Sequence, residues 1–192
     1  PLDKYREFIE SYDNIKIKDL DIDKEARVGI FGTIGNIKKI VTKNKDLMLV
    51  FDLEDYTHKI SVTVFPRQYQ EFGHYILENE AVFVEGILRL DSFGGEETLK
   101  LNMNSIIDIS DINTLPMYKV YILVESKDKV KLGELKEIIK EHSGKHRIFM
   151  AFREEEKREL IELSEKLRVN PSKEFIQEVT RLLGEGTVKI KK

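Results

Sequence analysis

Cysteine and tryptophan are absent from the 192-residue sequence. Without cysteine, the chain has no disulfide framework, no thiolate nucleophile and no cysteine-ligated zinc site. The sequence also lacks a signal-peptide pattern and any apolar run long enough to span a bilayer, so we expect a soluble cytoplasmic protein. Charged residues make up 35% of the chain and hydrophobic residues 41%, a balance that allows a core in each of two small domains.

The first residue is Pro1 rather than methionine, and residues 1–12 have the pattern of a helix with proline near its start. A chain that begins within a helical element is typical of a fragment of a longer protein. Removal of a tag is the competing explanation.

Charge is distributed unevenly along the chain, although the net charge is only −3. Residues 24–47 hold six basic residues against two acids, whereas residues 48–110 hold four basic residues against eleven acids. Random clustering on a solvated face is the common explanation for such a segment. The basic segment has functional meaning only if its side chains share one surface.

Alternating apolar and polar residues predict five strands in the first part of the chain, with a short helix between the third and the fourth. Gly29, Gly32 and Gly35 indicate bends in the first strand, which can then serve two sheets. This order is that of a five-stranded OB-fold Greek-key barrel. A sandwich with an inserted helix is the alternative. The expected strands are 27–42, 47–55, 59–65, 81–90 and 98–109, and the expected helix is 66–77.

The second part of the chain predicts a small βαββαβ two-layer domain of the split-βαβ type, so the overall class is β plus α/β. One of its segments, 159–169, has a helical composition but is predicted as a strand from its position between a strand and a helix. The expected organisation is therefore an N-terminal helix and connector (1–23), an OB-fold domain (24–112) and a C-terminal α/β domain (117–192), with a boundary in 110–116.

The sequence offers no recognisable active site. No serine lies beside a histidine and an acid in a readable pattern, and no glycine-rich loop precedes a helix. His142 and His146 have a zinc-like spacing but are expected to be solvated turn residues. Asp52, Glu54 and Asp55 could hold a divalent ion, although a polar outer face is the better explanation. We therefore predict no catalytic residue, no metal ligand and no cofactor.

Binding of single-stranded nucleic acid is the function that the barrel suggests. OB barrels hold single strands across one face, framed by the loops after strands one and four, here 42–47 and 91–96. Phe93 in the second loop could stack on a base, or could be a local plug over the hairpin. Lysines in and before the first loop could bind phosphates without reading sequence. The predicted nucleic-acid-binding residues are Lys38, Lys39, Lys43, Asn44, Lys45 and Phe93.

Several segments in fixed order resemble the C-terminal region of the bacterial DNA polymerase III alpha subunit. They are the opening "PLDKYREF", the hairpin "KIVTKNKDLMLVFDLED", the junction "VFPRQY" and the late "LRVNPSKEF". Lys39 stands where the family commonly has arginine, and the last domain departs from the family at "KRELIELSEK". The resemblance covers nearly the whole chain.

This resemblance implies an OB domain near the single-stranded template and a last domain that docks the tau-type subunit of the clamp loader. It places the catalytic domains upstream, so it implies a non-catalytic fragment of a polymerase. Two other functions stay open: an OB-type RNA-binding module, and a protein-interaction scaffold whose basic rim is only solvated.

Overall fold

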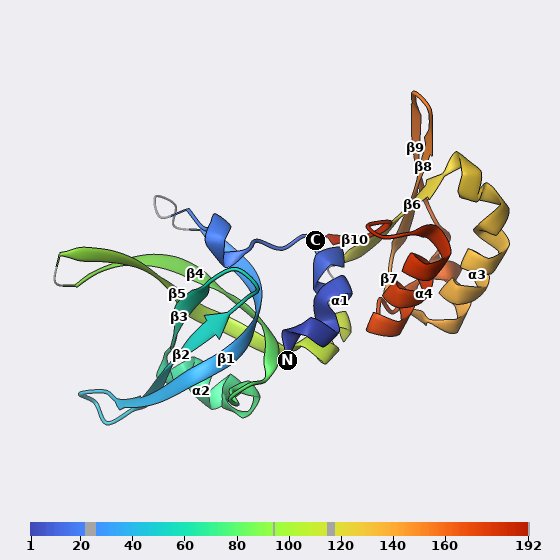
Figure 1. Cartoon of the computed structure of the whole chain (residues 1–192). Helices are drawn as coiled ribbons and strands as arrows, with labels where there is room; N and C mark the ends of the chain where they lie inside the picture. Colours follow the sequence, from blue (N-terminus) through green and yellow to red (C-terminus); the bar gives the residue numbers. More distant parts are fainter. Residues whose placement is uncertain (22–25, 94, 115–117, 192) are drawn as a thin grey trace. The chain divides into compact units, whose positions relative to one another are not determined.

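The computed structural model divides the chain into two compact units, and each is described by itself (Figure 1). The barrel unit comprises Pro1–Lys4 and Asn14–Ile112, and the C-terminal unit comprises Tyr5–Asp13 and Asn113–Lys192. The grouping of residues 5–13 with the C-terminal unit is a feature that the sequence does not predict. The structure describes all residues except 22–25, 94, 115–117 and 192. Within these described residues, no helix is long and apolar enough to cross a membrane.

The barrel unit is a closed five-stranded barrel with the strand order β1-β2-β3-β5-β4. Strands β3 and β5 are parallel, and the other neighbours are antiparallel. This is the predicted OB fold, with its helix α2 between β3 and β4. The elements are β1 (Arg27–Val41), β2 (Leu47–Glu54), β3 (Lys59–Val64), α2 (Pro66–Phe72), β4 (Ala81–Phe93) and β5 (Glu96–Asp108).

Strand β1 bends so that it pairs with two neighbours, as the glycines predict. Its first half, Arg27–Thr33, pairs with β4, and its second half pairs with β2. A Cβ atom on Gly32 would lie 2.6 Å from the side chain of Leu53, so this close approach requires glycine. The register with β2 shifts between Gly35 and Lys38, where Asn36 has a positive φ of 51°. One strand therefore closes the barrel.

The connector before β1 seals one end of the barrel core. Ile17 is buried with the core residues of the strands, which include the fully buried Phe51 and Val62. The backbone N–H of Ile17 donates to Asp55 Oδ2 at 2.7 Å, just after β2. Short 3-10 helices occupy Leu2–Tyr5, Ile17–Asp19, Gly73–Tyr75, Ile109–Thr114, Ser126–Lys131 and Glu165–Leu167.

The C-terminal unit is a four-stranded sheet, β10-β6-β8-β9, with helices α3 and α4 on one side of it (Figure 1). Val120, Ile122 and Val124 alternate with more exposed residues on β6, so only one face of the sheet is buried. The elements are α1 (Arg6–Ser11), β6 (Lys119–Glu125), α3 (Leu132–Glu141), β7 (Ser143–His146), β8 (Ile148–Glu154), β9 (Lys157–Glu162), α4 (Lys173–Leu183) and β10 (Val188–Lys191).

The two-layer α/β class is confirmed, but the split-βαβ arrangement is wrong. In a split unit another strand lies between the two parallel strands that a helix connects. Here β6 and β8 are parallel and directly hydrogen-bonded neighbours, and β9 forms a hairpin with β8. The segment 159–169 is strand only as far as Glu162 and then continues into a short 3-10 helix.

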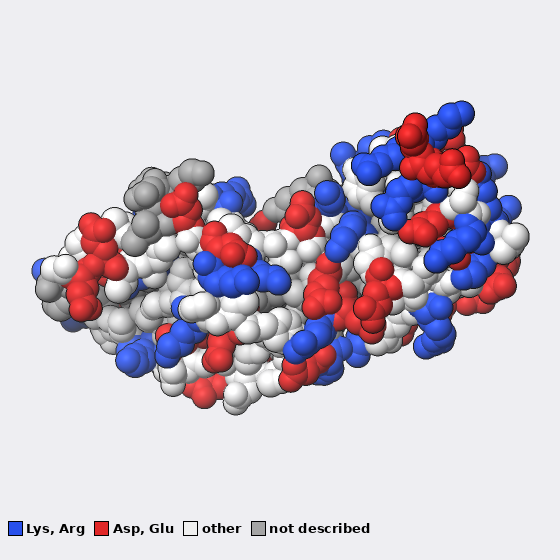
Figure 2. Space-filling view, turned by 45° about the horizontal axis from the view of Figure 1, so that its top comes forward, with Lys and Arg blue, Asp and Glu red and all other residues white. Residues whose placement is uncertain are grey.

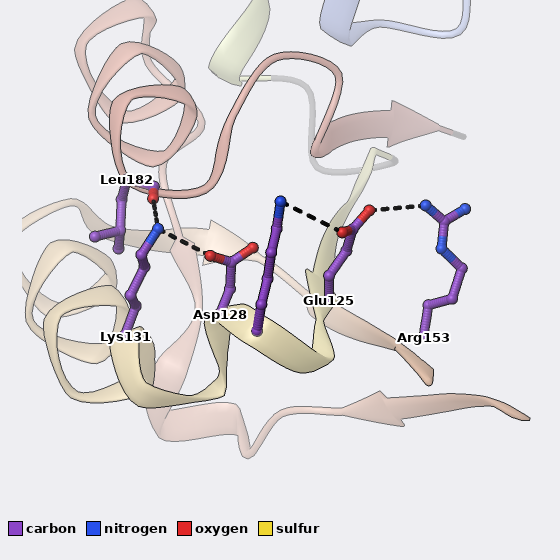
Figure 3. Close-up of polar contacts among 6 residues, drawn as sticks. Glu125, Asp128, Lys131, Arg153 and Leu182 are labelled. Atoms are coloured by element: carbon purple, nitrogen blue, oxygen red, sulfur yellow. Dashed lines mark hydrogen bonds and ion pairs between the residues drawn. The ribbon is translucent and has the colours of Figure 1, made fainter. Parts of the chain in front are cut away.

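A half-exposed lysine, Lys131, connects the turn before α3 with the end of α4 (Figure 3). Asp128 is only 4% exposed, and its carboxylate Oδ1 lies 2.8 Å from Lys131 Nζ. The same ammonium donates to the carbonyl oxygen of Leu182, at 2.9 Å, near the end of α4. Lys131 therefore holds the turn before α3 against the end of α4, because it satisfies a buried carboxylate and a terminal carbonyl together.

The two histidines differ from the expectation of solvated turn residues. His146 is only 2% exposed. His142 is partly buried, with its Nε2 3.3 Å from Glu178 Oε2 and its Nδ1 3.5 Å from the hydroxyl of Ser172. Both lie where β7 meets the segment before α4, so their role is to pack and connect these elements.

Candidate nucleic-acid interface

Two hairpins, β1–β2 and β4–β5, project from the same side of the barrel (Figure 1). The β1–β2 tip is closed by hydrogen bonds between Thr42 and the residues after it. The N–H of Thr42 donates to the Asp46 carbonyl (2.8 Å), and the N–H of Asp46 donates to the Thr42 hydroxyl (3.1 Å). Lys45 has a φ of 66°, and Lys43, Asn44 and Lys45 are exposed. This longer turn explains why the tip needs no Asn-Gly pair.

Lys38 and Lys39 lie on opposite faces of the β1–β2 ribbon. Lys39 is paired with Leu49, which belongs to the face that lines the barrel core. Lys38 is paired with Val50, on the outer face of the barrel. Paired residues share a face, and successive residues alternate between faces. Of the predicted binding residues, Lys43, Asn44 and Lys45 therefore lie together at the tip. Lys38 lies on the outer face of the ribbon, and Lys39 lies on the opposite face.

The outer face of β1, β2 and β3 carries further polar side chains that were not among the predicted binding residues, including Asp52, for which a polar outer face was favoured. Asp52 accepts a hydrogen bond from Asn36 Nδ2 at 2.8 Å and lies 3.6 Å from Lys59 Nζ. Next to them, Ser61 of β3 is paired with Lys100 of β5, whose ammonium forms an ion pair with Asp91. Their outward placement could have been predicted from the strand alternation, because they occupy the positions between the buried residues.

The second hairpin differs from the expected loop 91–96. Strand β4 continues to Phe93 and β5 starts at Glu96, so the two strands extend into the stretch that was expected to be a loop, and Gly95 has a φ of 88°. Phe93 is paired with Glu96. Its side chain lies outside the described residues, so its predicted stacking role stays a prediction. Glu96 and Glu97 are exposed near this tip, which makes the second hairpin more acidic than the first.

Asp55 accepts hydrogen bonds that hold the turn after β2 and the segment at Ile17 together. Its Oδ1 accepts hydrogen bonds from Thr57 N–H (2.6 Å), the Thr57 hydroxyl (2.6 Å) and His58 N–H (2.9 Å), and Oδ2 accepts from Ile17. Burial raises the pKa of Asp55, but these hydrogen bonds outweigh burial and leave the pKa below its ordinary value. In the part of the chain that the structure describes, no group of three or more His, Asp or Glu side chains could hold a metal ion.

Charge on the surface is mixed. Figure 2 shows lysine and arginine side chains interspersed with aspartate and glutamate over the visible face of each unit. On the face shown, basic side chains therefore form no large continuous field. Attraction between exposed charges on such a mixed surface is screened as salt is added.

Comparison with known proteins finds two kinds of similarity. Residues 28–109 match the family tRNA_anti-codon, described as an OB-fold nucleic acid binding domain. The whole chain (100%) is 25% identical to 17% of the DNA polymerase III subunit alpha of Buchnera aphidicola, over 197 residues. The match to the same subunit of Aquifex aeolicus is shorter: it covers 47% of this chain and 8% of the relative, with 39% sequence identity.

Among solved structures, the chain is similar to the mitochondrial single-stranded DNA binding protein Rim1 of S. cerevisiae. The similarity covers 45% of this chain and 97% of that one, with 19% identity and a TM-score of 0.37. A score this low adds nothing to the assignment of function.

The chain spans about one sixth of the length of the curated relatives that it matches from end to end, 17% in one case and 16% in another. The matches cover both units of the chain, and the barrel contains the OB fold that the family match describes. The resemblance found in the sequence is therefore confirmed. The chain's homologues are bacterial DNA polymerase III alpha subunits, and the chain corresponds to one segment of such a subunit.

Proposed function

We propose that the barrel unit binds single-stranded DNA across the outer face of β1, β2 and β3, as a non-catalytic part of a replicative polymerase. The observation that carries this proposal is the exposed lysine tip of β1–β2. Lys43 and Lys45 are exposed at the tip of the hairpin whose outer face carries Lys38, and Lys59 lies on the outer face of β3. Homology to DNA polymerase III alpha subunits supports DNA as the ligand.

The chemistry of this face favours contact with the backbone of a single strand over reading of its sequence. Ammonium groups bind phosphate oxygens as mobile point charges and do not distinguish bases. Ser61 and Thr63 on β3 offer hydroxyls on the same face, next to the pair of Asp52 and Asn36. The carboxylate of Asp52 is held by Asn36 and Lys59, which reduces its repulsion of a nearby phosphate.

The proposal extends to the C-terminal unit and to the protein's setting. We propose that this unit docks a replisome partner, a tau-type subunit of the clamp loader, in the cytoplasm, and homology to DNA polymerase III alpha subunits supports the replisome setting. The segment itself has no polymerase activity in this proposal. A primer-extension assay with the chain alone should show no nucleotide incorporation, and incorporation would contradict the proposal.

Fluorescence anisotropy of a labelled oligo-dT, titrated with the full chain at low and moderate salt, tests the DNA proposal. We expect binding that weakens as salt rises, because neutralised phosphates release counterions. Binding at low salt that does not depend on salt, or no binding at all, would contradict it.

Two alternatives each rest on one observation. The name of the matching family, tRNA_anti-codon, favours an RNA ligand. The acidic β4–β5 hairpin favours a protein-interaction scaffold. Competition with unlabelled oligo-U and oligo-dT separates them: stronger competition by oligo-U indicates an RNA-binding module, and a scaffold binds neither oligonucleotide.

A further inference from the structure

The sheet of the C-terminal unit has one face that its helices do not cover. The helices α3 and α4 lie on one side of the sheet (Figure 1), where Val120, Ile122 and Ile148 are buried. On the other face, which we call the open face, the alternate residues Tyr121, Leu123 and others are only partly buried. An exposed sheet face with apolar side chains is typical of a binding surface.

Aromatic side chains lie at the centre of the open face. Tyr121 of β6 and Phe149 of β8 are register partners on the two central strands. Their rings stack, with centroids 5.1 Å apart and an interplanar angle of 19°. The guanidinium of Arg147 lies 5.2 Å from the centroid of the Phe149 ring. Beside them Leu160 of β9 is 59% exposed and is paired with Ala151.

Basic residues outnumber acidic residues on this face. The strand registers and the contact of Arg147 with Phe149 place six basic side chains on it: Lys119, Arg147, Arg153, Arg158, Lys189 and Lys191. The acidic side chains are Glu125 and Glu162, and each is already paired. Glu125 Oε1 lies 2.8 Å from Arg153 (Figure 3), and Glu162 Oε1 lies 2.6 Å from Arg147.

The excess positive charge is available to a ligand. Within the described residues, Lys119, Arg158 and Lys191 form no ion pair, although the charge of Lys119 contributes to lowering the pKa of Glu162, and Lys189 donates only to the carbonyl oxygen of Glu10, at 3.2 Å. Lys119 and Lys191 are register partners at one end of the face, and Arg158 lies at the other end. Since strands rise about 3.3 Å per residue, these ends lie roughly 20 Å apart, with the aromatic pair between them.

We propose that the open face of the C-terminal unit is a second binding surface for single-stranded nucleic acid, with a base stacked on Tyr121 and phosphates bound at the basic ends. Aromatic rings accept bases of any sequence, and flanking cations bind the backbone. Four-stranded sheets with aromatic side chains on the central strands bind RNA in this manner in RNA-recognition motifs. A partner protein with an acidic surface would match the charge, but it would not need the stacked pair.

Photocrosslinking locates the contact directly. The full chain is irradiated with oligo-dT that contains 4-thiothymidine, digested with trypsin and analysed by mass spectrometry. Cleavage after Lys119, Lys127, Arg147 and Arg153 releases the peptides 120–127 and 148–153, which hold Tyr121 and Phe149 respectively. We expect adducts on at least one of them. Adducts confined to the barrel unit would overturn the proposal and leave the barrel proposal intact.

Binding measurements on variants test the role of the ring. In a Lys43→Ala/Lys45→Ala background, Tyr121→Leu should weaken oligo-dT binding by about five-fold or more, because one stacked base is lost. Tyr121→Phe, which keeps the ring, should bind like the parent. If Tyr121→Leu instead weakens binding of a tau-type clamp-loader subunit and leaves oligo-dT binding unchanged, this face docks protein and the proposal is wrong.

Charge-matched variants test the basic ends. Lys119→Ala/Arg158→Ala should lower the salt slope of oligo-dT binding by about 1.4, since each phosphate contact of a single strand contributes roughly 0.7. Lys136→Ala/Arg181→Ala removes the same charge from exposed positions on helices α3 and α4 and should leave the slope unchanged. Equal slopes for the two double variants would overturn the proposal. Circular dichroism melts confirm that each variant is folded.

Discussion

Removal of the two exposed lysines at the β1–β2 tip is the sharpest test of the barrel interface. Lys43→Ala/Lys45→Ala changes no described hydrogen bond of a side chain, because the turn is closed by Thr42 and Asp46. Lys45 has a positive φ, and alanine keeps the Cβ that makes this conformation costly, so the substitution should leave the backbone strain and the thermal melt nearly unchanged. A loss of binding without a loss of stability can therefore be assigned to charge.

The size of the effect follows from counterion release. Each phosphate contact of a single strand contributes about 0.7 to the slope of log K against log salt, so loss of two contacts lowers the slope by about 1.4. The ratio of the variant's dissociation constant to the parent's should then fall about sevenfold when salt rises fourfold, from 50 to 200 mM. Anisotropy titrations of labelled oligo-dT at four or more salt concentrations measure this slope.

A matched control separates local binding from net charge. Lys16→Ala/Lys18→Ala removes two exposed lysines from the connector, where the N–H of Lys18 contacts Thr57 just beyond the far end of β2. That end lies about 25 Å along the strand from the hairpin tip. We expect the control to keep the parent's slope. If both double variants lower the slope equally, the hairpin lysines act only through the net charge, and the proposed clamp is refuted.

Three further changes test the structure itself. Gly86→Ala places a Cβ 2.4 Å from a backbone oxygen of β5 and should lower the free energy of unfolding by about 1–3 kcal/mol in urea titrations, whereas Gly35→Ala, with open space around it, should be nearly neutral. Asp55→Asn should lower the melting temperature at pH 7. Because folding lowers the pKa of Asp55, the ionised carboxylate stabilises the fold above about pH 4, and this stabilisation is lost as the pH falls through the folded pKa. The difference in melting temperature between parent and variant should therefore shrink in acid. A difference that stays constant with pH would contradict this account. Lys131→Met leaves the buried Asp128 carboxylate without its cation and should destabilise the C-terminal unit by about 1–3 kcal/mol, measured by the same titration.

The barrel could be predicted from the sequence because its strands carry a local signal. Apolar residues alternate along β2 and β3, and glycines mark the bend of β1, so the number of strands and the position of α2 follow from short windows. The extent of the β4–β5 hairpin did not follow, because "DSFGGEE" contains turn-forming residues whose pairing is decided by long-range register. Asp91 and Ser92 continue the ladder with Thr98 and Glu97.

The candidate site was predicted in part. The tip residues Lys43, Asn44 and Lys45 are exposed together because they are neighbours in one turn. Lys38 and Lys39 are also neighbours, but a strand turns successive side chains to opposite faces, and the irregularity at Asn36 decides which of them faces outward. A one-residue shift in register would exchange them. The sequence alone could not supply that choice.

The order of strands in the C-terminal unit could not be predicted from the sequence for a similar reason. The pattern of strands and helices is compatible with both the split arrangement and the observed one, because each requires the same hydrophobic faces. Only the direct pairing of β6 with β8 brings Tyr121 beside Phe149. In the split arrangement another strand would lie between them. The observed topology thus creates the aromatic centre of the open face.

The two proposed surfaces differ in what they can recognise. The β1–β2 tip offers lysines, so its affinity is electrostatic and indifferent to whether bases are present. The open face combines stacked rings with flanking cations, so part of its affinity depends on bases and persists at higher salt.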